Sequence, residues 1–164
     1  ILLIEALKLR ASKNDALVML GDGPLLHKCK ELAADVDNIF LPGEKSNVSE
    51  YLSVADCFLS ASKAEGLPNA VLEALACGLP ILLSDIPSHR EILARSREVG
   101  EIFSVGNLTS LNQAIENLEI TSDRRAAAGL LAKESFSAEA MSHAYQTLYR
   151  QQVAMMSQRA GSKQ

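Results

Sequence analysis

The sequence has no tryptophan, few other aromatic residues, and no long apolar run. No apolar stretch reaches the roughly 18 residues that span a bilayer, which excludes a transmembrane helix. Glu73, Gly78 and Pro80 interrupt the longest of these stretches. The net charge of −4 provides no basic footprint for DNA or RNA, so nucleic acid is not an expected partner.

Cysteine is also scarce, with three residues and no CxxC pair. Cys29, Cys57 and Cys77 lie far apart in apolar segments, and no histidine stands at ligand spacing from them. We therefore expect buried, reduced thiols. Together with the lack of a signal peptide, this predicts a cytoplasmic protein.

Several catalytic patterns are missing as well. There is no Walker sequence and no G-x-G-x-x-G, and no serine lies in a G-x-S-x-G turn. Ser60, Ser62 and Ser84 lack that turn. The three histidines have no partner at metal or triad spacing: His27, His89 and His143. Hydrolase and dehydrogenase chemistry thus have no support, and no metal site is expected.

The sequence contains short apolar runs that alternate with helical segments of about ten residues. This predicts an α/β fold, with a Rossmann-like parallel sheet flanked by helices on both faces. Runs such as residues 16–20 indicate strands buried on both faces. The expected strands are 16–20, 38–41, 56–60, 80–84 and 100–104. The expected helices are 1–9, 25–34, 47–53, 109–118, 122–133 and 137–156, with two more starting at Pro68 and, through a Ser88–Glu91 capping box, at residue 88.

The first nine residues are helical in pattern, with no initiator methionine, no cap and no preceding strand. We therefore expect the chain to begin inside a domain, with the first strand of the sheet missing. Residues 1–157 are expected to form one domain. The polar and small residues 158–164 are expected to be a disordered tail.

The chain is organised around Glu65-Gly-Leu-Pro-Asn-Ala-Val-Leu-Glu73, which reads as a loop followed by a helix. Pro68 suits the first helical position, because its φ is fixed and its missing N–H would have no intrahelical partner there. Leu67 provides no capping oxygen. The N–H groups from Asn69 and Ala70 onward therefore need water or a ligand, and a phosphate suits both their direction and the helix dipole.

Two carboxylates lie on either side of this helix start. Glu65 precedes it and Glu73 follows one turn inside it, so each can accept hydrogen bonds from ligand hydroxyls. Apolar neighbours on both sides of Glu73 predict that it is partly buried and needs donors. Two glutamates at a fixed spacing are also consistent with a solvated surface.

Five segments, in order, resemble the group 1 (family 4) retaining glycosyltransferases. The most specific is Glu65 to Pro80, which is similar to the E-x7-E segment of that family. The other four are similar to its GDGP turn, its N-V-x-F-L-G strand, its AD before a buried strand and its loop with Glu-Ile: residues 21–24, 38–43, 55–56 and 87–92. The resemblance implies the C-terminal, donor-binding half of a GT-B fold.

In the resembling family, the second glutamate binds the ribose and the first binds the donor sugar. Carried over, Glu73 is the ribose ligand, and Glu65 is both the sugar ligand and the catalytic residue. The implied ligands of the sugar and diphosphate are Glu65, Gly66, Leu67, Pro68, Asn69 and Ala70. The implied residues flanking the nucleobase are Gly21, Gly23, Leu41, Gly43 and Val48, although turn geometry alone would also explain glycine there.

The resemblance implies metal-independent transfer of a hexose or hexosamine from a nucleotide diphosphate sugar, UDP-linked, to a saccharide or lipid-linked acceptor. No cofactor is implied beyond the donor. An N-terminal domain would bind the acceptor, so this chain alone would be inactive. The full-length protein would be compatible with peripheral association at the inner face of the membrane. Lys63 and Arg90 are candidates to bind phosphate. Two alternatives stay open: a related sugar-nucleotide enzyme, such as a phosphorylase-like or epimerase-like protein, and a non-catalytic binding or assembly module.

Overall fold

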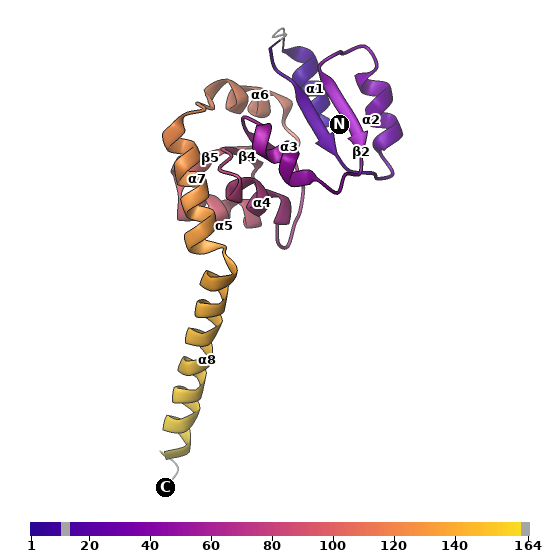
Figure 1. Ribbon diagram of the computed structural model, residues 1–164. Helices are drawn as coiled ribbons and strands as arrows, with labels where there is room; N and C mark the ends of the chain where they lie inside the picture. The colour runs from indigo at the N-terminus through magenta and orange to yellow at the C-terminus, as the bar shows by residue number, and fades with distance from the viewer. Residues whose placement is uncertain (11–13, 162–164) are drawn as a thin grey trace.

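The computed structural model describes residues 1–10 and 14–161, with side chains up to Met156. Its strands are β1 (Leu17–Leu20), β2 (Ile39–Gly43), β3 (Phe58–Ser60), β4 (Ile81–Ser84) and β5 (Gly100–Phe103). Its helices are α1 (Leu2–Leu9), α2 (Leu26–Ala33), α3 (Val48–Val54), α4 (Asn69–Ala76), α5 (Pro87–Arg95), the 3-10 helix η1 (Arg97–Val99), α6 (Leu108–Asn117), α7 (Ser122–Ser135) and α8 (Ala138–Gly161). All strand pairs are parallel and helices pack around them, which confirms the α/β class (Figure 1).

The strands form two sheets, not the single sheet expected. One has the order β1-β2 and the other β3-β4-β5. Helix α1 packs against both: Ile4 belongs to the apolar cluster of the first sheet, and Ala6 to a cluster of the second that contains Leu82 and Phe103. Within the described residues, no strand of one sheet pairs with a strand of the other. The two sheets are instead connected by side chains of α1 that pack against both.

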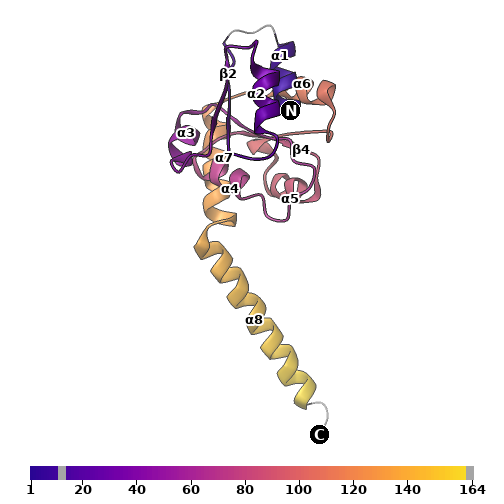
Figure 2. The ribbon, with the colours of Figure 1, turned by 90° about the vertical axis from the view of Figure 1, so that its right-hand side faces the viewer.

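Burial differs sharply between the sheets. All four residues of β4 are buried. In the two-stranded sheet, by contrast, Val18 is 45% exposed and Phe40 is 51% exposed, so the expectation that β1 is buried on both faces is wrong. The reason is that α1 and α2 lie on the same side of β1 and β2 (Figure 2), where they cover Leu17 and Ile39.

Helix α4 ends in a Schellman motif. Gly78 has a φ of +70°, a conformation that favours glycine. Its N–H donates to the Leu75 carbonyl at 2.9 Å, and the Leu79 N–H donates to the Ala74 carbonyl at 3.0 Å. These bonds satisfy two carbonyls in the last turn of α4 and turn the chain directly into β4.

The end of β2 lies further along the chain than expected. Pro42 and Gly43 belong to the strand instead of terminating it. The pairing extends this far because the Gly43 carbonyl accepts a hydrogen bond of 2.9 Å from the N–H of Gly21, the residue that follows β1.

The expected capping box at the start of α5 is absent. The helix begins at Pro87, whose fixed φ suits a first helical position, so Ser88 lies inside the helix and not before it. The buried Oγ of Ser88 has no hydrogen-bond partner among the described residues, and Glu91 instead faces Arg95 at 4.0 Å.

Two further expectations need correction. All three cysteines are free, but only Cys29 is buried; Cys57 and Cys77 are half-buried. Burial raises the pKa of the Cys57 thiol to about 11, so this thiol stays protonated at neutral pH.

Helix α8 extends away from the rest of the molecule (Figure 1) and continues to Gly161, past residue 158, where a disordered tail was predicted. Residues 162–164 lie outside the described part.

The close approach of β5 to β4 gives a first test. A Cβ at Gly100 would lie 1.9 Å from the Ile81 carbonyl oxygen and 2.7 Å from its Cγ1. We expect Gly100→Ala to lower the free energy of unfolding, measured by urea denaturation, by at least about 1 to 3 kcal/mol. Gly129→Ala in α7 is the control, because its Cβ meets nothing within 4 Å and should stabilise the helix by roughly 0.5 to 1 kcal/mol. Equal unfolding midpoints for the two variants would contradict this packing.

Candidate functional site

The segment between β3 and α4 leaves the sheet at the carboxyl ends of two parallel strands, β3 and β4. Ligands bind at this edge in open α/β sheets. Glu65, Gly66 and Leu67 are exposed, while Pro68 is buried. The loop is thus anchored at its C-terminal end and presents its backbone and carboxylate to solvent.

Pro68 occupies a different place from the one predicted. It precedes α4, with φ −82° and ψ 73°, and is not the first helical residue. The Asn69 N–H donates to the Leu67 carbonyl at 3.0 Å, so Pro68 is the centre of an inverse γ-turn. The Asn69 amide, which was predicted to need a ligand, therefore has a protein partner.

Three backbone N–H groups at this helix start have no hydrogen-bond partner in the described part of the chain: those of Gly66, Leu67 and Ala70. No side chain caps the helix. The groups are exposed, so water satisfies them when no ligand is present. An anion here would gain from these donors and from the helix dipole, which contributes about 0.3 to 1 kcal/mol.

The two glutamates lie on either side of these donors, but Glu73 is exposed and not partly buried as predicted. Val71, Ala74 and Leu75 form the buried face of α4, which leaves Glu73 on its outer face. Neither carboxylate has a hydrogen bond or an ion pair to any described residue. Both can therefore accept hydrogen bonds from a ligand.

The residues predicted to flank a nucleobase lie at and beyond the ends of β1 and β2. Gly21 and Gly43 are hydrogen-bonded to each other and both have positive φ, +125° and +78°. Gly23 follows in the turn before α2, and Val48 begins α3. Leu41 packs against the apolar cluster under the two-stranded sheet. The predicted site residues thus come from both sheets.

Of the two basic candidates, only Lys63 is unpaired. Arg90 donates from Nε and Nη2 to the two carboxylate oxygens of Asp85, with an Nη2 to Oδ2 distance of 2.8 Å. This hydrogen-bonded pair holds the pKa of Asp85 below its usual range and raises that of Arg90. Lys63 is exposed and makes no ion pair within the described residues.

A buried polar group beneath the loop is not predicted by the sequence reasoning. Ser60 and Ser84 are the last residues of β3 and β4, and His89 lies in the first turn of α5. Ser84 and His89 are fully buried and are connected by hydrogen bonds to Ser62 in the loop. The signal that could have indicated this group is a serine at the end of two successive apolar strands.

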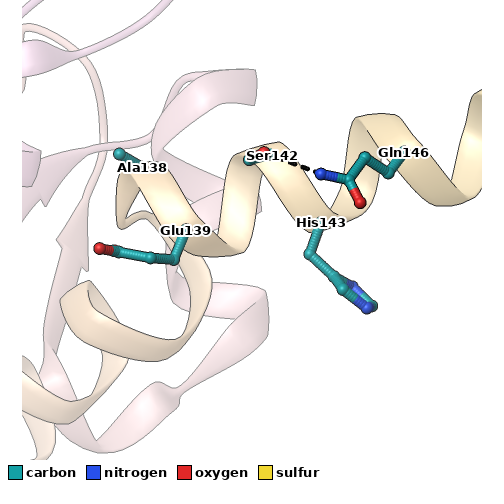
Figure 3. Close-up of a pocket in the computed structure, with 5 residues that line it drawn as sticks. All are labelled: Ala138, Glu139, Ser142, His143 and Gln146. Carbon is teal, nitrogen blue, oxygen red and sulfur yellow. Dashed lines mark hydrogen bonds between the residues drawn. The ribbon is translucent and has the colours of Figure 1, made fainter.

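A surface hollow occurs elsewhere, along the start of α8 (Figure 3). Its lining consists of Ala138, Glu139, Ser142, His143 and Gln146. All five come from one helix, so this hollow cannot enclose a ligand. Among the described residues, no helix is long and apolar enough to cross a membrane. No group of three or more potential metal-ligating side chains occurs there either.

The fold and the open helix start define a class of protein, an α/β domain with an uncapped helix start at the carboxyl edge of its parallel strands. The profile of the family described as glycosyl transferases group 1 matches residues 1–135. The chain therefore belongs to the group 1 glycosyltransferases and corresponds to the C-terminal half of their GT-B fold.

Relatives and solved structures agree with this family. The chain is 30% identical over 141 residues to N-acetyl-alpha-D-glucosaminyl L-malate synthase of Bacillus anthracis, covering 81% of this chain and 36% of the relative. It is 27% identical over 115 residues to UDP-Gal:alpha-D-GlcNAc-diphosphoundecaprenol alpha-1,3-galactosyltransferase of Escherichia coli, covering 68% and 29%. A glycosyltransferase structure from Rickettsia africae ESF-5 superposes with a TM-score of 0.77 at 22% identity, over 92% of this chain and 43% of that one. The chain thus spans less than half the length of each.

The Asp85–Arg90 pair predicts a pH dependence. The pKa of Asp85 is lower in the folded state than in the unfolded state. The contribution of this ion pair to folding stability is therefore fully present above the unfolded pKa of about 3.9. It is lost as the pH falls through the folded pKa. We expect Arg90→Gln to move the Asp85 pKa upward, as measured by NMR titration of its carboxyl carbon. Arg95→Gln, which removes a different surface arginine, should leave that titration unchanged. An unshifted Asp85 pKa in Arg90→Gln would contradict the pairing.

Proposed function

We propose that this chain is the donor-binding half of a retaining glycosyltransferase that uses a UDP-linked hexose or N-acetylhexosamine. The observation that carries the proposal is the start of α4, where three N–H groups lie between two carboxylates and none of these five groups has a partner among the described residues. The names of the relatives support this choice, since one is a galactosyltransferase with a UDP-Gal donor and the other an N-acetylglucosaminyl malate synthase.

The proposed roles follow from the chemistry of each group. The carboxylates of Glu73 and Glu65 accept hydrogen bonds from the ribose and from the donor sugar, respectively. Hydrogen bonds to a charged group contribute roughly 1.5 to 3 kcal/mol each, which orients a donor but does not bind it alone. The N–H groups of Gly66, Leu67 and Ala70 donate to the diphosphate or to the sugar.

Sugar transfer develops negative charge on the leaving diphosphate. Donors that are already aimed at that charge stabilise it with little reorganisation, so the N–H groups of Gly66 and Leu67 in the loop and of Ala70 in α4 supply electrostatic catalysis. Lys63 is the available cation in this loop. The proposed chemistry uses no metal, and a saccharide or lipid-linked acceptor is bound by the remainder of the full-length protein. This half alone is then expected to bind donor and to turn over little or none.

NMR titration of the chain with UDP, GDP and ADP tests the proposal. We expect UDP to be preferred and to move the amide signals of residues 65–73. Glu73→Gln should weaken UDP binding about tenfold, because two hydroxyls lose a charged acceptor. Glu65→Gln should spare UDP but reduce the additional affinity for UDP-glucose or UDP-N-acetylglucosamine.

Glu139→Gln in α8 is the matched control, because it neutralises an exposed glutamate in the surface hollow outside the proposed site. It should bind UDP like the unmodified chain. Equal affinity for all three nucleotides, without shifts at residues 65–73, would overturn the proposed function.

A further inference from the structure

We propose that Ser84 and His89 are positioning residues for the loop that carries Glu65. They act by holding the Ser62 carbonyl at the point where the loop leaves the sheet. The inference rests on the proposed function, because it concerns the presentation of Glu65 to a donor sugar.

The direct contact is a hydrogen bond between segments far apart in sequence. Ser84, at the end of β4, donates from Oγ to the Ser62 carbonyl at 2.5 Å. Ser84 is fully buried, so water does not compete for this bond. Ser62 precedes Glu65 by three residues, and the bond therefore acts close to the proposed sugar ligand.

This bond is also the loop's main polar attachment. Among the described residues, no other hydrogen bond joins residues 61–66 to an element beyond β3. The remaining contact is local, from the Ser60 hydroxyl at the end of β3 to the Ser62 hydroxyl at 3.2 Å. Because the next anchor is the γ-turn at Pro68, the path of Glu65 and Gly66 is set by two fixed points, of which Ser84 provides one.

His89 in turn orients Ser84. Its Nδ1 lies 2.8 Å from the Ser84 carbonyl oxygen, which can only accept, so Nδ1 carries the ring proton. The same Nδ1 lies 3.3 Å from the Ser84 hydroxyl, which accepts as a second, weaker partner because it gives its own proton to Ser62. The hydrogen bonds therefore run in one direction, from His89 to Ser84 to the Ser62 carbonyl.

The other ring nitrogen of His89 is consistent with this role. Nε2 is buried and has no hydrogen-bond partner among the described residues. In the Nδ1–H tautomer, Nε2 has no proton to donate and carries only a lone pair. An unpartnered Nε2 therefore leaves an acceptor unused but no buried N–H. Donation from Nδ1 is therefore the polar interaction that the ring contributes here.

Loss of the hydrogen bond from Ser84 to Ser62 should affect binding of the donor's sugar more than binding of its nucleotide. Glu73 projects from α4, which the Schellman motif and the apolar core hold in place independently of Ser84. Glu65 lies in the loop. We therefore expect Ser84→Ala to lower the UDP-sugar affinity relative to the UDP affinity by roughly two- to tenfold, the effect of one buried hydrogen bond.

The experiment compares Ser84→Ala with Ser53→Ala in the 164-residue chain. Ser53 is an exposed serine whose hydroxyl also donates to a backbone carbonyl, that of Glu50 at 2.7 Å, but it lies in α3. We expect ¹⁵N order parameters of residues 62–66 to fall in Ser84→Ala alone. The ratio of UDP-glucose to UDP affinity should fall in the same variant alone.

His89 is tested by two substitutions and one spectrum. In His89→Asn the side-chain amide N–H can take the place of Nδ1–H, so this variant should keep most of the loop order that His89→Leu loses. Imidazole ¹⁵N shifts should show the proton on Nδ1. If His89→Leu does not fold, His89→Asn and Ser84→Ala still decide the question.

Two results would overturn the inference. One is an order-parameter profile of Ser84→Ala that matches Ser53→Ala at residues 62–66; the other is a ring proton on Nε2. If the unmodified chain binds no UDP-sugar, the proposed function fails. The order parameters, measured without ligand, would then still decide whether Ser84 positions the loop.

Discussion

The packing of one face of α4 is the constraint on which the site depends. Val71 and Leu75 are buried in the same cluster as Ile81 of β4 and Ala128 of α7, so the helix cannot rotate without opening the core. The Schellman motif at its C-terminal end satisfies the carbonyls of Ala74 and Leu75 within the protein. Its N-terminal end, which has neither a capping side chain nor a complete set of hydrogen bonds, is therefore the end that can bind a ligand.

A rigid helix and a lightly attached loop meet at this point. The helix presents Glu73 from a fixed backbone, whereas Glu65 lies on a loop held by a γ-turn at one end and a buried serine near the other. A rigid helix beside a less firmly held loop suits a ligand made of a nucleotide and a sugar. In the proposed function, the nucleotide is bound through Glu73 on the helix, and the sugar, whose bond must break, is bound through Glu65 on the loop.

Much of this arrangement follows from local sequence. Pro68 and the run into Gly78 indicate a helix that begins without a capping side chain, and five signatures in order indicate the family. Other features depend on tertiary contacts. The exposure of Glu73 depends on which face of α4 meets α7, and the Asp85–Arg90 pair and the buried histidine depend on how α5 follows β4. The inverse γ-turn at Pro68 depends on a backbone angle that proline does not fix, since its ring constrains φ and leaves ψ open.

The division into two sheets has a geometric consequence. Gly21 and Gly43 belong to one sheet and Glu65 to the loop of the other, and α1 packs against both through Ile4 and Ala6. The spacing between the glycines expected to flank a nucleobase and Glu65, the proposed sugar ligand, therefore depends on how Ile4 and Ala6 of this eight-residue helix pack. A change of side-chain volume at Ile4 or Ala6 would lengthen or shorten that spacing without altering any of the proposed ligand-binding residues.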